Sequence, residues 1–447
     1  MHKVLVLGAG LVSSPIVRYF LDRPDCSLTV ATMFRKDAES LIDGHPRGRA
    51  VALDVSDGEA LASAISVADL VVSLVPFHLH GTVAKVAIEH RVHLVTTSYI
   101  SPEMRALDDA AKKAGVMLLN ECGLDPGLDH MSAMHVIDQV HARGGRVLGF
   151  ESCTGGLPAP DSCTNPWNYK FSWSPRGALV AGTYAARFMR DGEVVEIPGP
   201  ELFANQREYE VDTLGTFESY PNRDSLPYQE KYGLNSVRNM LRGTIRYPGW
   251  SRTMKKMSDR GYFSLEPREF AAGMTLADLS AELCGVSPTS GDELRNAVAD
   301  SMQLAADDDV LVRMNWAGLF EATPLSESAA TTLDQLATVF EHQLQYAPGE
   351  RDMVVMQHRF DVETAEGERE VHHSQLICYG DRDGTTATSR TVSWPAAIAS
   401  SLVLDGKLAL RGVQIPTKKE IYGPILGQLE PLGIAFREWI EPAQKDG

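Results

Sequence analysis

A glycine-rich motif near the N-terminus is the first candidate for chemistry. Gly8 and Gly10 are followed by Ser13, which makes a G-x-G-x-x-S pattern directly after the apolar run 4–7. In dinucleotide-binding folds, the first glycine makes a tight turn, the second lets the backbone approach the pyrophosphate, and the third position needs only a small side chain. The motif therefore predicts a dinucleotide site, with the N–H groups of a following helix facing the phosphates.

The residues after the second apolar run bear on which nicotinamide cofactor binds. An acidic residue here accepts from the ribose hydroxyls of NAD, whereas a basic residue pairs with the 2′-phosphate of NADP. The stretch 31–36 contains Arg35 and Lys36 and no acidic residue. We therefore predict NADP, with NAD the less favoured cofactor. The alternative is that both basic side chains simply solvate a loop.

Two later turns carry polar side chains suited to handling a proton. Thr97, Ser98 and Tyr99 end one predicted strand, and the sequence 124–127, which contains Asp125, follows the next. In open parallel sheets, ligands bind beyond the carboxyl ends of the strands. Tyr99 and Asp125 are thus candidates for orienting an amine or accepting a proton. The alternative is that Asp-Pro-Gly is an ordinary turn and that Tyr99 only fills space.

Three arginines further along the chain suit a substrate with several carboxylates. Arg223, Arg242 and Arg246 lie among loop and aromatic residues. A guanidinium group binds a carboxylate through two parallel hydrogen bonds. Salt bridges to the many acidic residues of the chain are the alternative.

Two pairs of histidines could suggest a metal site, but the residues near them in the sequence do not support one. His78 and His80 are two residues apart, and His372 and His373 are adjacent. Neither pair has a cysteine or carboxylate at a diagnostic spacing. We predict no metal site.

Short apolar runs alternate with helical stretches up to about residue 120, and this rhythm positions the turns described above. It predicts a parallel, doubly wound α/β sheet. Helical periodicity dominates from about 234 to 345, and two strands flanking the turn 364–367 predict a β-hairpin. The expected strands are residues 4–7, 28–30, 50–53, 70–74, 93–97 and 116–119, and the clearest expected helices are 59–67, 103–114, 275–284, 291–306 and 329–344.

Composition narrows the class of protein. The chain has 447 residues, which suggests two or three domains, and a formal net charge of −17, which disfavours nucleic acid as a partner. No apolar run reaches the roughly 18 to 20 residues that span a bilayer. The six cysteines have no C-x-x-C spacing, which argues against structural zinc and a disulfide scaffold. We expect a cytoplasmic protein with no membrane partner.

With these residues in view, the chain resembles the saccharopine reductase family nearly end to end. The resemblance rests on residues 8–15, 97–102, 120–130, 155–160, 169–174 and 242–247. It implies NADP-dependent interconversion of saccharopine with L-glutamate and L-2-aminoadipate 6-semialdehyde, by hydride transfer at the C–N bond and imine hydrolysis.

The family also implies an organisation into three parts and a homodimer. The parts are a Rossmann domain (1–130 and 395–447), a mixed α/β substrate and dimerisation domain (131–233 and 348–394), and a mostly helical insertion (234–347).

The motifs and the resemblance together give one set of candidate site residues, with Tyr99 and Asp125 as the catalytic pair. The expected substrate contacts are Ser98, Tyr99, Asp125, Arg223, Thr244, Ile245 and Arg246. The expected cofactor contacts are Gly8, Ala9, Gly10, Leu11, Val12, Arg35, Asp54, Val55, Val75, Thr97, Ser98, Leu124, Asp125 and Pro126.

Two positions depart from the family pattern. Thr154 stands where family members have cysteine before Gly-Gly-Leu-Pro-Ala-Pro, and Cys153 lies one residue earlier. A catalytic thiol is therefore not expected. Met33 stands where the family tends to have arginine, so the NADP preference rests on Arg35.

Two other functions compete with this one. A carboxyspermidine-type dehydrogenase reduces a similar imine formed with a polyamine, but three arginines favour the substrate with more carboxylates. A non-catalytic protein that senses the dinucleotide would keep the glycine-rich turn and lose turnover.

Overall fold

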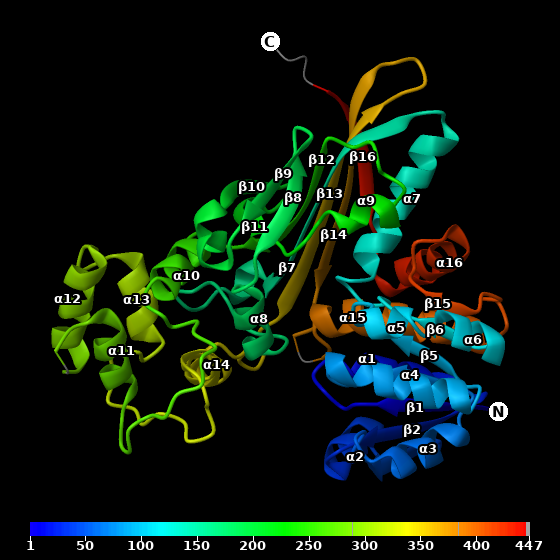
Figure 1. Ribbon diagram of the computed structural model, residues 1–447, viewed down its shortest axis with the longest axis horizontal. Coiled ribbons are helices and arrows are strands. Elements are labelled where there is room, and N and C mark those ends of the chain that lie inside the picture. The colour runs from blue at the N-terminus through cyan, green and yellow to red at the C-terminus, as the bar shows by residue number, and fades with distance from the viewer. Residues whose placement is uncertain (288, 383, 444–447) are drawn as a thin grey trace. The chain divides into compact units, whose positions relative to one another are not determined.

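The structure is a computed structural model that describes residues 1–287, 289–382 and 384–443 (Figure 1). The chain divides into two compact units. Unit 1 comprises residues 1–147 and 362–447, and unit 2 comprises residues 148–361. The division into three parts that the family resemblance implies stays a prediction.

Unit 1 is built on a seven-stranded parallel sheet in the order β15-β6-β5-β4-β1-β2-β3. The order reverses at β1, as in doubly wound folds, so ligand-binding turns are expected beyond the carboxyl ends of the central strands. The Rossmann prediction is confirmed. The strands are β1 (His2–Leu7), β2 (Cys26–Thr32), β3 (Gly48–Ala52), β4 (Leu70–Ser73), β5 (His93–Thr96), β6 (Met117–Leu119) and β15 (Gly412–Gln414).

Helices cover this sheet because its strands are apolar on both faces. All four residues of β4, Leu70–Ser73, are buried, and Leu5, Leu94 and Leu118 from three other strands join one core cluster with residues of the helices. The connecting helices are α1 (Ser14–Asp22), α2 (Arg35–Ile42), α3 (Gly58–Ser66), α4 (His80–Glu89), α5 (Pro102–Arg105), α6 (Asp108–Ala114) and α7 (Leu128–Ala142).

One helix expected over residues 103–114 is instead two, α5 and α6. The second begins at Asp108, whose carboxylate accepts from the N–H of Val413 on β15 at 2.8 Å and from Lys112 at 2.6 Å. Leu107, between the two helices, packs against the core cluster. These tertiary contacts interrupt a stretch whose local sequence favours a single helix.

The C-terminal segment, residues 362–447, belongs to unit 1. Helix α15 (Ala387–Leu404) packs against α1, and Asp405 after it forms an ion pair with Arg23 at 2.8 Å. Helix α16 (Lys419–Leu429) packs against α7. Unit 1 also contains the antiparallel pair β14 (Arg369–Tyr379) and β16 (Arg437–Pro442).

Unit 2 contains a mixed sheet and a group of helices. Its neighbouring strands follow the order β10-β11-β12-β7-β13, and β12 pairs in parallel with β7 and antiparallel with β11. The strands are β7 (Arg146–Pro158), β8 (Ala186–Arg190), β9 (Glu193–Ile197), β10 (Arg207–Val211), β11 (Gly215–Pro221), β12 (Asn239–Arg246) and β13 (Asp352–Glu363). The helices are α8 (Pro175–Ala181), α9 (Pro227–Lys231), α10 (Trp250–Ser258), α11 (Leu276–Cys284), α12 (Gly291–Met302), α13 (Asp309–Trp316) and α14 (Thr332–Gln343).

The segment 234–347, expected to be mostly helical, starts with a strand. Residues 239–246 form β12 because Met240 and Ile245 are buried in the sheet and the strand pairs on both sides. The helices expected at 275–284, 291–306 and 329–344 are present as α11, α12 and α14. Both strands of the predicted hairpin are also present, and Thr364 N–H donates to Glu368 O at 2.9 Å across the turn between them.

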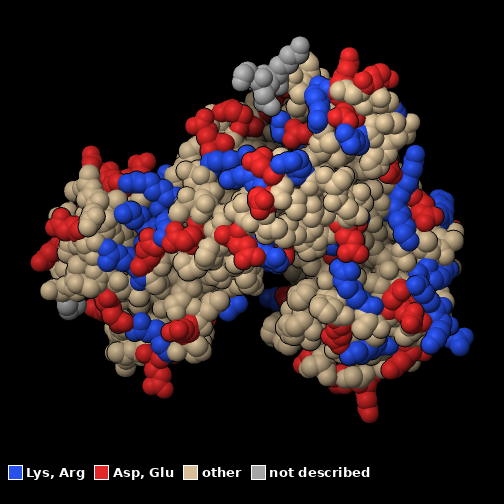
Figure 2. All heavy atoms as spheres, turned by 45° about the horizontal axis from the view of Figure 1, so that its top comes forward, with Lys and Arg blue, Asp and Glu red and all other residues tan. Residues whose placement is uncertain are grey.

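Charged side chains of both signs are intermingled on the face shown in Figure 2. Ion pairs such as Arg252–Asp308, at 2.6 Å, and Arg351–Asp161, at 2.9 Å, neutralise part of the basic surface. Among the described helices, none is both long and apolar enough to cross a lipid bilayer.

Candidate functional site

The glycine-rich turn has the geometry that a pyrophosphate needs. Gly8 has a φ of 106°, and a Cβ there would lie 2.8 Å from Leu74 O, so only glycine fits. A Cβ on Gly10 would meet no protein atom within 4 Å. The space beside Gly10 is therefore open, at the entrance to the N-terminus of α1, whose first N–H groups and positive dipole end favour an anion. Ser13 is fully buried and fills the third position of the motif.

A side chain of α15 fixes the rest of the turn through a hydrogen bond. The carbonyl of Val12 accepts from the hydroxyl of Ser393, and the N–H of Ser13 donates to Gly10 O at 3.0 Å. Leu11 is 69% exposed, next to Ala9 and Gly10. Backbone groups of this turn are thus fixed while its outer side chain faces solvent.

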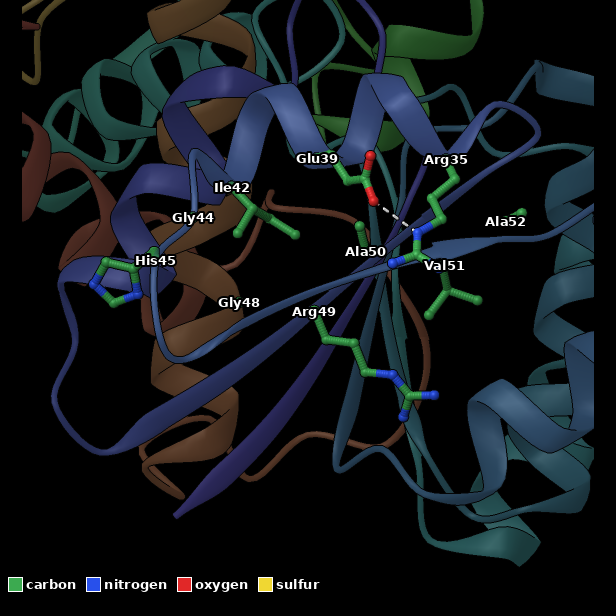
Figure 3. Close-up of a pocket in the computed structure, with 10 residues that line it drawn as sticks. All are labelled: Arg35, Glu39, Ile42, Gly44, His45, Gly48, Arg49, Ala50, Val51 and Ala52. Carbon is green, nitrogen blue, oxygen red and sulfur yellow. Dashed lines mark hydrogen bonds and ion pairs between the residues drawn. The ribbon is translucent and has the colours of Figure 1, made fainter.

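Arg35 lies in the first turn of α2, immediately after β2. Its side chain is exposed and donates to Glu39 at 2.8 Å. It borders a pocket of about 640 Å³ between α2 and β3, together with Arg49 and His45 (Figure 3). Arg49 is a second cation at this pocket that the sequence reasoning did not single out, because it lies within a strand rather than in the turn after β2.

Three other expected cofactor contacts, Asp54, Val55 and Val75, follow the ends of β3 and β4. Asp54 accepts from the hydroxyl of Ser56 at 2.7 Å and from its N–H at 2.9 Å, and these hydrogen bonds lower the pKa of Asp54. Val55 is buried in the core of unit 1, and Val75 packs against the same core. Residues that are far apart in the sequence thus lie at the same edge of the sheet, beyond the carboxyl ends of its parallel strands.

Tyr99 and Asp125, 26 residues apart in sequence, are in contact. The hydroxyl of Tyr99 donates to Asp125 Oδ1 at 2.8 Å. The backbone brings their turns together, because Glu121 N–H donates to Ser98 O at 3.1 Å and Cys122 N–H donates to Thr96 O at 3.1 Å. A phenol and a carboxylate joined in this way can pass a proton between them or to a nearby water.

A buried hydrogen-bonded pair next to these turns was missed by the sequence reasoning. Glu121 Oε2 lies 2.6 Å from His130 Nε2, and both side chains are fully buried. Glu121 Oε1 also accepts from Ile100 N–H at 3.0 Å, directly after Tyr99. Glu121 therefore fixes the turn that carries Tyr99. The string 120–130, on which the family resemblance partly rests, contains both residues of this pair.

In unit 2, Arg246 is a buried cation surrounded by aromatic rings. It is 6% exposed, and its guanidinium lies 5.0 Å from the ring centre of Tyr169 and 5.5 Å from that of Trp250. Nη1 donates to Ile245 O at 2.8 Å, whereas Nε has no hydrogen-bond partner within the described residues. Cation–π contacts stabilise the charge but leave its in-plane N–H groups for an anion.

The carboxylate opposite Arg246 is engaged elsewhere. Glu218 on β11 is the register partner of Arg246, and it accepts from the N–H groups of Gly249 and Ser251 at the start of α10, at 2.9 and 2.5 Å. The side-chain polar atoms of Thr154, Tyr169 and Trp250 also lack hydrogen-bond partners in the described part of the chain. Buried polar groups of this kind are rare in native proteins unless a ligand or water satisfies them.

Thr244 and Arg246 project from the same face of β12, because alternate residues of a strand point the same way. Ile245 points to the opposite face, is fully buried, and contributes its carbonyl. The guanidinium of Arg223 lies 4.9 Å from the ring centre of Tyr184. These expected substrate contacts belong to unit 2, whereas Tyr99 and Asp125 belong to unit 1.

Cys153 has the properties of a structural thiol. It is fully buried, and burial raises the pKa of its thiol to about 12. Its Sγ lies 3.3 Å from the hydroxyl of Ser219. A thiol that stays protonated is a poor nucleophile.

Two family models cover most of the chain. Residues 4–119 match the saccharopine dehydrogenase NADP binding domain, and residues 123–434 match the saccharopine dehydrogenase C-terminal domain. The chain belongs to the saccharopine dehydrogenase family.

Curated relatives and a solved structure agree with this assignment. The chain is 37% identical to the L-glutamate-forming, NADP-dependent saccharopine dehydrogenase of Schizosaccharomyces pombe, over 98% of this chain and 99% of that protein. It is 38% identical to the enzyme of the same name from Pyricularia oryzae, over 98% of each chain. The solved structure of the L-Glu-forming saccharopine dehydrogenase from Saccharomyces cerevisiae matches with a TM-score of 0.91 and 36% identity, over 99% of this chain and 100% of that one.

These findings confirm the family, the fold class and the NADP prediction. The near full-length relatives are all named as NADP-dependent, L-glutamate-forming saccharopine dehydrogenases. Neither a carboxyspermidine-type activity nor a non-catalytic sensor is therefore favoured. The roles of the individual site residues stay predictions.

Proposed function

We propose that this protein is an NADP-dependent saccharopine dehydrogenase that forms L-glutamate. The observation that carries the proposal is the buried guanidinium of Arg246, which has an unpartnered N–H and lies against two aromatic rings. Keeping a cation buried without a carboxylate partner costs several kcal/mol per ion, on the order of the effective penalty seen in proteins. A substrate with several carboxylates, such as saccharopine, would offset that cost.

NADP would lie with its pyrophosphate at the turn that contains Gly10 and with its 2′-phosphate near Arg35. The open space at Gly10 and the cationic border of the pocket at Arg35 and Arg49 support this placement. When bound, NADP would accept the hydride from the lysine-side carbon of the C–N bond. The described backbone N–H groups of the turn are the donors available to the phosphates.

Tyr99 and Asp125 are proposed to orient the amine of saccharopine and to help it lose its proton. Hydride can leave the carbon only when the neighbouring nitrogen has a lone pair to form the C=N bond, and a secondary ammonium ion has none. The hydrogen bond from the Tyr99 hydroxyl to Asp125 Oδ1 fixes the orientation of the carboxylate. Water then adds to the imine carbon, and breaking the C–N bond releases L-glutamate and L-2-aminoadipate 6-semialdehyde.

Arg246, Arg223, Thr244 and the backbone at Ile245 are proposed to bind the substrate carboxylates. Arg246 is supported by its unpartnered Nε, and Thr244 by its place on the same strand face. Ser98, at the end of β5, is proposed to contact both ligands, and Thr97, Leu124 and Pro126 to border the nicotinamide.

Proposals for the oligomeric state and the cellular compartment also follow from the family resemblance and the composition. We propose that the chain forms a homodimer, as the family resemblance implies, and that it works in the cytoplasm. The six cysteines all lie within the described residues, none of them forms a disulfide, and five are buried, which suits a reducing compartment. Light scattering coupled to gel filtration would test the dimer, and a monomer would refute it.

Steady-state formation of NADPH from saccharopine and NADP is the direct test of function. We expect turnover of saccharopine with release of L-glutamate. The decisive control replaces saccharopine with a carboxylated polyamine of similar length. A protein that turns over the polyamine and not saccharopine, or neither, would overturn the proposal.

A further inference from the structure

His80 lies at the centre of a buried hydrogen-bond chain that ends at Ser98, and His80 itself has no part in the proposed mechanism. It is the first residue of α4 and is 4% exposed. Its Nδ1 lies 2.9 Å from Ser73 Oγ at the end of β4, and its Nε2 lies 2.8 Å from Ser98 Oγ just beyond the end of β5. Thr96 Oγ1 lies 3.4 Å from both ring nitrogens and accepts from Ser98 N–H at 3.3 Å.

The imidazole is neutral in this environment. Burial lowers the pKa of His80 to about 4, with a smaller contribution from His78. A neutral imidazole has one N–H donor and one acceptor nitrogen, so each of its two serine contacts must run in a defined direction. Which nitrogen carries the proton follows from the neighbours.

The surroundings of Ser73 determine the direction of the two hydrogen bonds of His80. It is fully buried, and within the described residues its hydroxyl bonds to His80 Nδ1. A buried O–H without an acceptor is unfavourable, so Ser73 donates to Nδ1. The ring proton therefore lies on Nε2 and donates to Ser98 Oγ. The hydroxyl proton of Ser98 is then free to point away from His80.

We propose that His80 is a positioning residue that makes the Ser98 hydroxyl a hydrogen-bond donor toward an acceptor oxygen of a bound ligand. The acceptor is a carboxylate oxygen of saccharopine or the carboxamide oxygen of the nicotinamide, because both are oxygens without a proton. Ser98 is half-buried at the carboxyl end of β5, where unit 1 is expected to bind both ligands. The inference rests on the proposed function for the identity of those ligands.

The sharpest test is a double-mutant cycle between His80→Leu and Ser98→Ala. If His80 acts through Ser98, each single change weakens binding of one ligand by about tenfold, the loss expected for a hydrogen bond to a charged or strongly polar acceptor. The double variant is then no weaker than Ser98→Ala, because the effects of coupled residues do not add. The measurements are the saccharopine KM and the NADP dissociation constant from fluorescence titration.

Conservative variants separate positioning from folding. His80→Gln can place an amide N–H near the position of Nε2, so it should recover most of the lost affinity. Ser73→Ala lets the ring proton occupy either nitrogen, so it should cost less than His80→Leu and nothing further in the Ser98→Ala background. His78→Gln, at an exposed position two residues away, is the matched control and should leave both constants unchanged. Thermal unfolding shows whether each variant is folded.

The outcomes distinguish the two ligands and the two hypotheses. A raised saccharopine KM with an unchanged NADP constant assigns the oxygen to the substrate, and the reverse assigns it to the cofactor. His80→Leu and Ser98→Ala losses that multiply in the double variant would overturn the proposal, as would a folded His80→Gln no better than His80→Leu. Absence of saccharopine turnover in the unmodified protein would instead refute the proposed function, while NADP titration would still test His80.

Discussion

The candidate site groups of the two units differ in how far the protein itself satisfies their hydrogen bonds. In unit 1, Tyr99 is bonded to Asp125, Glu121 to His130, and His80 to two serines. In unit 2, Arg246 is buried with an unpartnered Nε. A group that handles a proton works best when its orientation is already fixed, whereas a group that binds an anion gains most when its own partners are missing.

This difference predicts two kinds of response to substitution. Changes at these groups of unit 1 should alter turnover or the binding of cofactor or substrate, and those that break a satisfied pair should also lower stability. Changes at Arg246 should weaken substrate binding without lowering stability. The predictions that follow run from the largest expected effect to the smallest.

Gly10→Val should abolish most NADP affinity while leaving the fold intact. The added side chain meets no protein atom at its Cβ, so it occupies the space proposed for the pyrophosphate. Losing two hydrogen bonds to a charged phosphate, at about 1.5–3 kcal/mol each, raises the dissociation constant at least about a hundredfold. Gly8→Ala is the control, because its Cβ would lie 2.8 Å from Leu74 O and should destabilise the protein itself. Unchanged NADP binding by Gly10→Val would remove the cofactor from this turn.

Arg246→Met should raise the saccharopine KM by at least about tenfold, because a lost guanidinium–carboxylate contact costs on the order of 2–5 kcal/mol. The thermal unfolding midpoint should stay level or rise, since a buried charge is replaced by an apolar side chain of similar length. NADP titration should give the same constant as for the unmodified protein. Arg246→Lys keeps the charge and should recover little, because lysine lacks the planar fork. A large fall in stability would show that Arg246 is a structural cation. The difference drawn between the site groups of unit 1 and unit 2 would then not hold.

Asp125→Ala should lower kcat by about tenfold, which is less than the hundredfold or more of a full general base because water can take over part of the role. The saccharopine KM should change little. Tyr99→Phe removes the hydrogen bond to Asp125 and keeps the ring, so it should produce a weaker form of the same change. Equal effects on kcat and on NADP affinity would place Asp125 among the binding groups instead.

Arg35→Ala should reduce the preference for NADP over NAD by about fivefold, because an exposed cation contributes about 1 kcal/mol to an ion pair. Lys36→Ala is the matched control on the next residue and should change the preference less. The ratio of catalytic efficiencies with the two cofactors measures this. If Arg49→Ala removed the preference and Arg35→Ala did not, the second cation of the pocket would be the one that binds the phosphate.

Local patterns in the sequence determined most of unit 1. The apolar runs predicted the six strands β1 to β6, and the spacing of Gly8, Gly10 and Ser13 predicted the turn after β1. Both signals depend on residues close in sequence. The family and the cofactor also followed from the sequence, because long strings of unusual residues carry more information than any one motif.

The tertiary structure decided the contacts between residues far apart in the chain. Helices α5 and α6 are separate because Asp108 bonds to Val413, about three hundred residues away, and β12 is a strand because it pairs on both sides. The same holds for the hydrogen bond of Tyr99 to Asp125 and for the aromatic rings around Arg246. Burial and hydrogen-bond partners depend on which strands become neighbours, and only the folded chain defines those neighbours.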